Sequence, residues 1–326
     1  MPPAPGEDAT PTVSAIIITR NRKEALTHVL DRLHEQPVGE ILVVDNGSSD
    51  GTAELVRGYG ARVRLLEPGA NLGLAGRNLA AKEATGELLL MLDDDAYPLP
   101  GAVEILLEAF AANPRLGVAG GLVRDVDSTG RVLFEDELGT FDWWLRAGRT
   151  GEAPPDGFPA FSFPEGACMI RHEAYAQADG FFEPYFLTNS EVDLTARLRA
   201  DDWEVRYFPS AVFDHMKAEA ERQTWDVNLY YRVRNHLWFI WLRFPTSLAV
   251  RRTIGYLSFD LLQAAYHRTP SAWWRGVRDA WLLRDQVRGE RRPLPRSVLR
   301  GAELNRGRMH VRLLVGQVTR KLRRAS

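Results

Sequence analysis

Three consecutive carboxylates form the strongest chemical signal in the chain. Asp93, Asp94 and Asp95 directly follow the largely apolar run 87–92, which has the composition of a buried strand. Three adjacent like charges destabilise one another unless a positive group neutralises them. Mg²⁺ and Mn²⁺ prefer carboxylate oxygens and commonly combine one or two of them with substrate phosphates. The triplet therefore predicts a divalent-cation site, and a solvated acidic loop is the alternative.

Similar polar clusters follow three other β-rich runs, at residues 13–19, 40–45 and 62–67. By itself, each cluster is also consistent with a simple turn or helix cap. In a parallel sheet, however, the carboxyl ends of the strands lie along one edge, where open α/β sheets bind ligands. We therefore expect the clusters to converge on one site. Their polar residues are Thr19, Asn21 and Arg22, then Asp45 and Asn46, then Asn71.

The elements that must position these residues alternate between strand-like and helical segments. Strands alternating with helices of this length predict an α/β fold, with a mostly parallel sheet and flanking helices. Residues 127–163 are rich in Gly, Pro and aromatic residues, which predicts a long surface excursion. The predicted helices are 23–35, 52–59, 74–85, 101–112 and 190–200, and the later strands are 117–123, 167–170 and 204–208.

Charge divides the chain into an acidic and a basic part. The 326 residues carry a net charge of −2, but residues 229–326 contain 21 Lys and Arg against 5 Asp and Glu, whereas residues 1–228 contain 20 against 38. We expect a loose Pro-rich arm at 1–12, the α/β domain at 13–228, and a basic, aromatic-rich helical region at 229–326. Opposite charges predict a different partner for each of the two larger regions.

Composition also excludes several classes of protein. With 45% apolar and 26% charged residues, the chain is not a disordered, collagenous or coiled-coil protein. The single cysteine, Cys168, excludes a disulfide framework and a cysteine-based zinc cluster, and its apolar surroundings predict a core residue. No uninterrupted apolar run reaches the roughly 18 residues that a membrane-spanning helix needs. The Pro- and acid-rich first residues do not resemble a signal peptide, so we expect a cytoplasmic protein.

Six segments carry a more specific pattern, because they occur in a characteristic order and spacing. They are SAIIITRNR, ILVVDNGSSDGT, NLGLAGRN, MLDDDAYP, EGACMIRHEAYAQADGF and NSEVDLTARL. From residue 13 to about residue 235, this pattern resembles the family 2 glycosyltransferases, which have the GT-A fold. Among the subgroups, it is most similar to the bacterial transferases of rhamnose-like or galactofuranose-like sugars.

The resemblance implies a nucleotide-sugar pocket at the strand ends. Thr19, Asn21 and Arg22 would line the base and ribose, and Asp45 would accept a hydrogen bond from the base. Arg77 would contact the diphosphate, and a solvated position on a helix is the alternative for this arginine. The other implied donor contacts are Asn71, Gly73, Asp93 and Asp94.

The resemblance also implies a metal cofactor, either Mg²⁺ or Mn²⁺. Its ligands would be Asp93, Asp95 and His215, although a lone histidine is more often structural. The metal would bridge the donor diphosphate and act as a Lewis acid when the sugar–phosphate bond breaks.

The catalytic base is implied by the segment NSEVDL. Many relatives carry Glu-Asp-x-Asp here, and their base is the second acid, which corresponds to Glu191; Ser190 replaces the first acid. Asp193 would orient the acceptor or be the second candidate for the catalytic base. Its structural alternatives are a first-turn acid or an ion pair with Arg197 at i+4. The residues implied on the acceptor side are Gly166, Ala167, Arg232 and Asn235.

Together, these roles predict a metal-dependent, inverting glycosyltransferase. It would move a sugar from a UDP-, dTDP- or GDP-linked donor to a glycan or lipid-linked acceptor in cell-surface glycan assembly. The alternatives are a transferase acting on a soluble small molecule, and a nucleotide-sugar- or lipid-binding scaffold without catalysis. A nucleotidyltransferase is disfavoured because TRNRKEA, after the first strand, contains no glycine-rich loop.

The basic region suggests a second partner. Helical spacing predicts helices at 254–266, 273–283 and 298–322, and around the second of them Trp273, Trp274 and Trp281 alternate with Arg275, Arg278 and Arg284. Such helices suit the headgroup region of an anionic membrane, which predicts a peripheral position on its cytoplasmic face. A helical bundle packed on the catalytic domain is the alternative. We expect no nucleic-acid partner, because the acidic first region would repel a polyanion.

Overall fold

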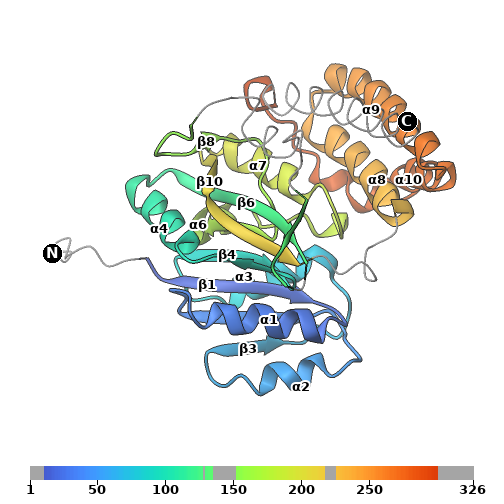
Figure 1. Ribbon diagram of the computed structural model, residues 1–326. Helices are drawn as coiled ribbons and strands as arrows, with labels where there is room; N and C mark the ends of the chain where they lie inside the picture. The colour runs from blue at the N-terminus through green and yellow to red at the C-terminus, as the bar shows by residue number, and fades with distance from the viewer. Residues whose placement is uncertain (1–10, 128, 135–151, 217–224, 300–326) are drawn as a thin grey trace, which may run out of the picture.

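The computed structural model describes residues 11–127, 129–134, 152–216 and 225–299 (Figure 1). Within this part of the chain, a ten-stranded sheet has the order β3-β2-β1-β4-β9-β6-β10-β5, with β7 beside β6 and β8 beside β10. The strands are β1 (Val13–Thr19), β2 (Glu40–Asp45), β3 (Val63–Leu66), β4 (Leu88–Asp93), β5 (Ala96–Pro98), β6 (Leu116–Val126), β7 (Val132–Phe134), β8 (Phe158–Pro159), β9 (Ala167–Arg171) and β10 (Glu204–Met216).

Helices cover both faces of the sheet (Figure 1). The α-helices are α1 (Lys23–Leu33), α2 (Thr52–Arg57), α3 (Gly76–Glu83), α4 (Ala102–Ala112), α6 (His172–Gln177), α7 (Ser190–Ala200), α8 (Trp225–Arg243), α9 (Thr246–Tyr266) and α10 (Pro270–Leu282). The short 3₁₀ helices are η1 (Gly73–Ala75), η2 (Glu183–Tyr185), η4 (Arg284–Gln286) and η5 (Arg288–Glu290).

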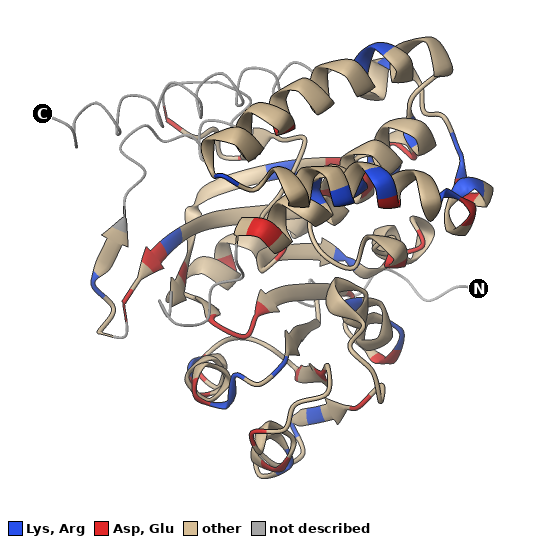
Figure 2. Ribbon diagram, turned by 90° about the vertical axis from the view of Figure 1, so that its right-hand side faces the viewer, with Lys and Arg blue, Asp and Glu red and all other residues tan. Residues whose placement is uncertain are grey.

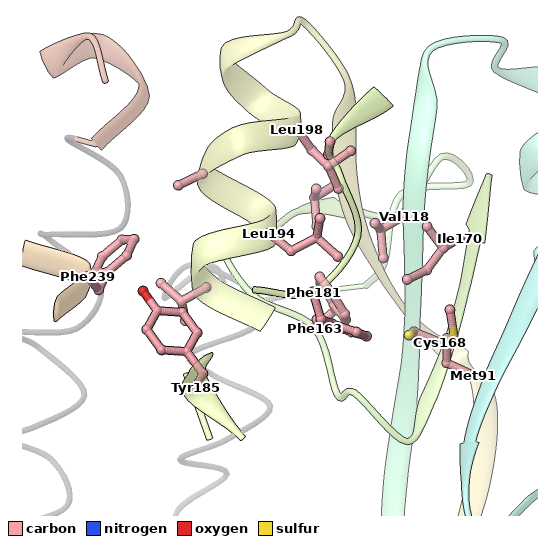
Figure 3. Close-up of a cluster of buried hydrophobic side chains, with 14 of the residues drawn as sticks. Met91, Val118, Phe163, Cys168, Ile170, Phe181, Tyr185, Leu194, Leu198 and Phe239 are labelled. Carbon is pink, nitrogen blue, oxygen red and sulfur yellow. The ribbon is translucent and has the colours of Figure 1, made fainter. Parts of the chain in front are cut away.

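The central strands are apolar on both faces because the sheet separates two cores. Ile17 of β1 and Leu90 of β4 belong to the core beneath α1, α2 and α4, whereas Ile16 and Met91 belong to the core beneath α3, α6 and α7. This alternation follows from the two-residue period of a strand. Cys168 lies in the second core, as expected; Figure 3 shows it beside Met91.

Strand direction brings most of the strand ends to one edge. β1 pairs in parallel with β2 and β4, and β2 pairs in parallel with β3. β9 is antiparallel to both β4 and β6, so β6 runs in the same direction as β4, and β10 is parallel to β6. The α/β fold with a mostly parallel sheet and flanking helices is therefore confirmed. The reversed β9 was not predicted, and it brings the residues just before Ala167 to the same edge.

The last strand is much longer than predicted. The sequence indicated a strand at 204–208, ended by Pro209, but β10 continues to Met216. The register with β6 shifts between Phe208 and Val212, and this irregularity accommodates a proline that cannot donate a ladder hydrogen bond. The extension carries His215 to the edge where the other strands end.

The helices after residue 224 pack on the same body. Leu237 and Phe239 of α8 belong to the core that includes the sheet and α7, and Figure 3 shows Phe239 near Tyr185. Trp238 of α8 donates its indole N–H to the carbonyl of Ala280 in α10 at 3.0 Å. In the described residues, no helix has the length and apolar character that a membrane span requires. The expected arm lies mostly outside the described residues, as does most of the expected helix 298–322.

Candidate active site

The three adjacent carboxylates form a corner in which two of them share one arginine. Asp94 and Asp95 are buried, and Arg22 contacts an oxygen of each at 2.9 Å. The Thr19 hydroxyl donates a hydrogen bond to Asp94 at 2.8 Å. Burial raises the pKa of Asp94 to about 7, against the opposing effect of the Arg22 guanidinium. The ends of β1 and β4, predicted to meet, therefore share one charged cluster, which we call the acidic corner (Asp93, Asp94 and Asp95).

Asp93 is held from behind by Arg77. The Arg77 guanidinium is 0% exposed and contacts Asp93 at 2.6 Å. Arg77 is therefore not a solvated residue on the helix surface, and its side chain is not exposed for contact with a donor diphosphate. Both expectations for this residue are wrong. Among the described residues, Arg77 Nε and Nη1 are buried without a hydrogen-bond partner. The guanidinium contacts the Asp93 carboxylate through Nη2, and this contact fixes the position of Asp93. Nothing in the sequence signalled this burial, because an arginine in the first turn of α3 is normally exposed.

His215 joins the acidic corner from β10. Its Nε2 lies 3.3 Å from Asp95, and its Nδ1 lies 3.0 Å from Asp125. Burial opposes the charged imidazolium, but the hydrogen bonds to Asp125 and Asp95 raise the pKa of His215 to about 10. Asp95 and His215, which lie 120 positions apart in the chain, are thus close to each other, which a shared metal site would require.

This donor set is compatible with a hard divalent cation that shares its shell with a substrate. In the described part of the chain, no three His, Cys, Asp or Glu side chains gather closely enough to hold a metal by themselves. Mg²⁺ normally takes only one or two protein carboxylates and completes its shell with phosphate oxygens and water. Asp95 provides a carboxylate of this kind, and His215 would provide an imidazole only after giving up the proton that Asp95 and Asp125 stabilise.

The predicted base lies in the first turn of α7 and is held by a second glutamate. Glu165 accepts the backbone N–H of Glu191 at 3.0 Å and so satisfies one of the free amides at the helix start. The Ser162 hydroxyl donates to the Glu191 carboxylate at 3.4 Å. Burial, and then the adjacent Glu191 carboxylate, raise the pKa of Glu165 well above its usual range.

Glu165 is the site residue that sequence reasoning missed. The only available signal was an acid beside Gly166 in an otherwise apolar segment. A Cβ on Gly166 would lie 2.2 Å from an oxygen of Asp93, so the glycine permits a close backbone approach. Contacts therefore run from Glu191 through Glu165 and Gly166 to Asp93. Gly166, expected on the acceptor side, lies between the acidic corner and the base, whereas Ala167 is 1% exposed and pairs with Leu92 in the sheet.

Asp193 does not face this site. It is 0% exposed, and its carboxylate contacts Arg197 at 2.8 Å and Arg243 of α8 at 2.6 Å. Burial would raise the pKa of Asp193, but the two arginines hold it below its usual range. We therefore correct its expected role: the i+4 ion pair is present, and Asp193 anchors α7 instead of touching an acceptor.

The donor-side loops form a compact network at the ends of β1 and β2. Asn21 accepts the backbone N–H of Ser49 at 2.7 Å, and Asp45 accepts both the N–H and the hydroxyl of Ser48. Asn71 accepts the N–H of Gly73 at 2.9 Å. Gly73 has a positive φ of 57°, and a Cβ there would lie 2.2 Å from the Phe186 carbonyl oxygen. A larger residue would therefore push the donor-side loop away from the segment that leads into α7.

Two residues expected on the acceptor side contact other parts of the chain. Asn235 is 0% exposed and donates its amide to the carbonyls of Tyr185, Leu187 and Thr188 at 2.6–3.1 Å. Arg232 contacts Asp260 of α9 at 3.2 Å. Direct acceptor contact by Asn235 is therefore wrong, because a fully buried amide presents no surface. Its carbonyl partners lie in or beside the loop 186–189, which directly precedes α7.

Comparisons with known proteins agree with this geometry. Residues 14–178 match the family model described as glycosyl transferase family 2. The chain is 29% identical to an N-acetylglucosaminyl-diphospho-decaprenol L-rhamnosyltransferase of Mycobacterium tuberculosis, over 80% of this chain and 95% of the relative.

Two solved structures share the fold. GalNAc-T7 with UDP, GalNAc and Mn²⁺ has a TM-score of 0.61 at 12% identity, covering 89% of this chain and 59% of that one. A mannosyltransferase of Pyrobaculum calidifontis with GDP-Man and Mn²⁺ has a TM-score of 0.55 at 17% identity, covering 95% and 87%. The chain therefore belongs to glycosyl transferase family 2 and is a glycosyltransferase with the GT-A fold.

Proposed function

We propose that this glycosyltransferase moves a rhamnose-like sugar from a nucleoside-diphosphate donor to a hydroxyl of a lipid-diphosphate-linked glycan, with inversion. The observation that carries the proposal is the contact path from Glu191 through Glu165 and Gly166 to Asp93. This path supports Glu191 as a carboxylate base close to the corner expected to bind the donor. The sugar and acceptor classes rest on the mycobacterial relative, whose alignment covers 95% of its length.

In the proposed reaction, Glu191 accepts the proton of the acceptor hydroxyl. The oxygen attacks the anomeric carbon from the face opposite the diphosphate, so a single displacement inverts the configuration. Glu165 accepts the backbone N–H of Glu191 and so fixes the start of α7, which orients Glu191 as the base. Thr19 and Arg22 orient the acidic corner against the donor.

Mg²⁺ or Mn²⁺ would be held by Asp95 and His215, with Asp93 beside the ribose or metal. When bound, the ion supplies Lewis-acid stabilisation of the leaving diphosphate. The enzyme would act in the cytoplasm, where nucleotide sugars and a cytosol-facing acceptor meet.

A nucleotide screen followed by a transfer assay tests the proposal. Thermal shifts with UDP, dTDP and GDP, each with and without Mn²⁺, should single out one base and require the metal. The matching rhamnosyl donor should then be transferred to a short-chain prenyl-diphosphate N-acetylglucosamine. Metal-independent binding would contradict the cation site. Transfer only to soluble sugars would contradict the lipid-linked acceptor class.

A further inference from the structure

A cavity lies among the C-terminal helices, and it is lined by none of the residues of the acidic corner. It encloses about 540 Å³ between α8, α9 and α10, within the range of about 300–1,000 Å³ typical of ligand sites. Its walls are mainly aliphatic and aromatic, and include Leu237, Trp241, Leu257, Val277 and Trp281. No residue of the acidic corner or of the Glu165–Glu191 pair lines it. We call it the helical cavity.

Positive charge lines one side of this apolar space. Arg284, Arg288 and Arg291 belong to the lining, and no Asp or Glu does. Among the described residues, Arg291 Nη1 and Thr253 Oγ1 are buried and have no hydrogen-bond partner. A buried donor without a partner costs about 1–3 kcal/mol, or more when charged. A ligand with an anionic head and an apolar body would satisfy the donors and fill the space.

The surface around the helical cavity has matching properties. Most of the exposed large apolar side chains in the described residues belong to α8, α9 and α10, including Ile254 at 65%, Trp274 at 60% and Trp281 at 67% exposure. Figure 2 shows basic residues, all of them Arg in this part of the sequence, distributed along these helices. Exposed tryptophans interleaved with arginines suit the headgroup region of an anionic bilayer. Nucleic acid would match the charge but not the apolar cavity.

We propose that the helical cavity binds one hydrocarbon chain of an anionic membrane phospholipid, whose phosphate lies against Arg284, Arg288 and Arg291. This inference depends on the proposed function only for the role of lipid binding, which would be to keep the enzyme beside a lipid-linked acceptor. α8 connects the two sites, because Leu242 lines the helical cavity and the next residue, Arg243, anchors Asp193 of α7. Lipid in the cavity therefore supports the helix that carries the base.

Quenching by brominated lipid tests the proposal directly. Vesicles containing phosphatidylglycerol brominated at mid-chain should quench tryptophan fluorescence, and Trp281→Phe should remove much of the quenching. The double variant Arg284→Ala/Arg288→Ala should weaken vesicle binding about tenfold more than the matched control Arg275→Ala/Arg278→Ala. The control pair lies on α10 outside the cavity lining and removes the same charge. Equal losses would show general surface attraction and overturn the proposal.

Filling the cavity provides an independent variant. Ala280→Phe and Val277→Phe should each reduce quenching while an unchanged far-UV circular dichroism spectrum and cooperative thermal unfolding show a folded chain. Undiminished quenching in a folded filled variant would overturn the proposal. So would quenching that appears only after residues 300–326 are deleted, which would show that the chain occupies its own cavity. Binding of geranylgeranyl diphosphate but not of phosphatidylglycerol would show that the cavity holds the prenyl chain of an acceptor. That result would also overturn the proposal.

The outcome is separable from the proposed transferase reaction. Nucleotide binding and transfer to a soluble, short-chain acceptor should remain within about twofold of wild type in the Arg284→Ala/Arg288→Ala variant, because neither residue touches the acidic corner. Loss of lipid binding with intact transfer supports the helical-cavity proposal. Absence of transfer in wild type, with lipid binding intact, would contradict only the proposed function.

Discussion

At the scale of single residues, the site combines two clusters that differ in charge: one contains both acidic and basic side chains, and the other contains two glutamates. Arg22 contacts Asp94 and Asp95, and Arg77 contacts Asp93, so two guanidinium groups face the three carboxyl groups of the acidic corner. Glu165 instead lies beside a second carboxylate, Glu191, and burial together with that neighbour raises the pKa of Glu165. The charge-paired corner suits an incoming metal–diphosphate, which replaces one set of charges with another. The glutamate pair suits proton transfer, because Glu165 fixes the backbone of the proposed base, Glu191.

Glu191→Gln should lower kcat by about 10²–10⁴-fold, the usual contribution of a general base. Donor binding should change little, because the side chain lies on the acceptor side of Asp93. Turnover and calorimetric titration with the nucleotide would separate the two effects. Wild-type turnover in this variant would eliminate Glu191 as the base.

Glu165 should act by positioning Glu191, so its variants should differ from one another. Glu165→Gln retains an oxygen that can accept the Glu191 N–H, whereas Glu165→Ala leaves that amide free. We expect Ala to lower kcat at least about tenfold more than Gln, with donor affinity nearly unchanged in both, in line with a lost buried hydrogen bond of about 1–3 kcal/mol. Equal kcat values for the two variants would contradict the positioning role.

At the scale of elements, α7 is fixed at both ends of its first turn by other parts of the chain. Glu165 caps it from the loop before β9, and Arg243 binds Asp193 from α8. Asn189, which precedes the helix, has a positive φ of 66° and makes no side-chain cap. The helix start therefore depends on tertiary contacts, which explains why the local sequence NSEVDL indicated the helix but not its anchors.

Asp193→Asn should destabilise the protein by about 3–5 kcal/mol, because it leaves two buried arginines without a countercharge. The pKa of Asp193 is lowered in the folded state, so its stabilisation is fully present above its ordinary value of 3.8 and is lost as pH falls below that value. Urea unfolding at pH 7 and pH 3.5 checks both points. The difference from wild type should shrink at the lower pH, and a constant difference would refute the assignment. Asp202→Asn, at an exposed position, serves as the control.

At the scale of the whole molecule, α8 connects the C-terminal helices to the catalytic site. Asn235 binds three carbonyls around the loop 186–189, and the carbonyl of Phe186 accepts the N–H of Leu74 at 2.9 Å on the donor side. Phe186, Thr188 and Asn189 all have positive φ, a costly conformation for residues other than glycine. The loop keeps that conformation because α8 and the donor-side turn hold it from two directions.

Asn235→Ala should therefore reduce both stability and activity. The carbonyls of Leu187 and Thr188 lose the Asn235 donor, at a cost of about 1–3 kcal/mol each where water cannot replace it, whereas the Tyr185 carbonyl keeps its hydrogen bond from Arg234. Hydrogen exchange should speed up in residues 185–191 and not in the distant helix α2, which provides an internal control. Unchanged exchange in that segment, with reduced activity, would contradict the coupling.

The sequence by itself determined the sheet, its flanking helices and the acidic corner, because each depends on local periodicity and on the rule that parallel strands end at one edge. Three features were decided only by tertiary structure. β9 reverses direction, Glu165 meets Glu191 across 26 positions, and Arg77 is buried behind Asp93. Each is a contact between distant segments, and no local preference for strand, helix or turn encodes which arginine becomes buried or which carboxylate finds a partner. The same distinction separates Asp193 from Glu191: two acids in one helical turn differ because α8 covers only one of them.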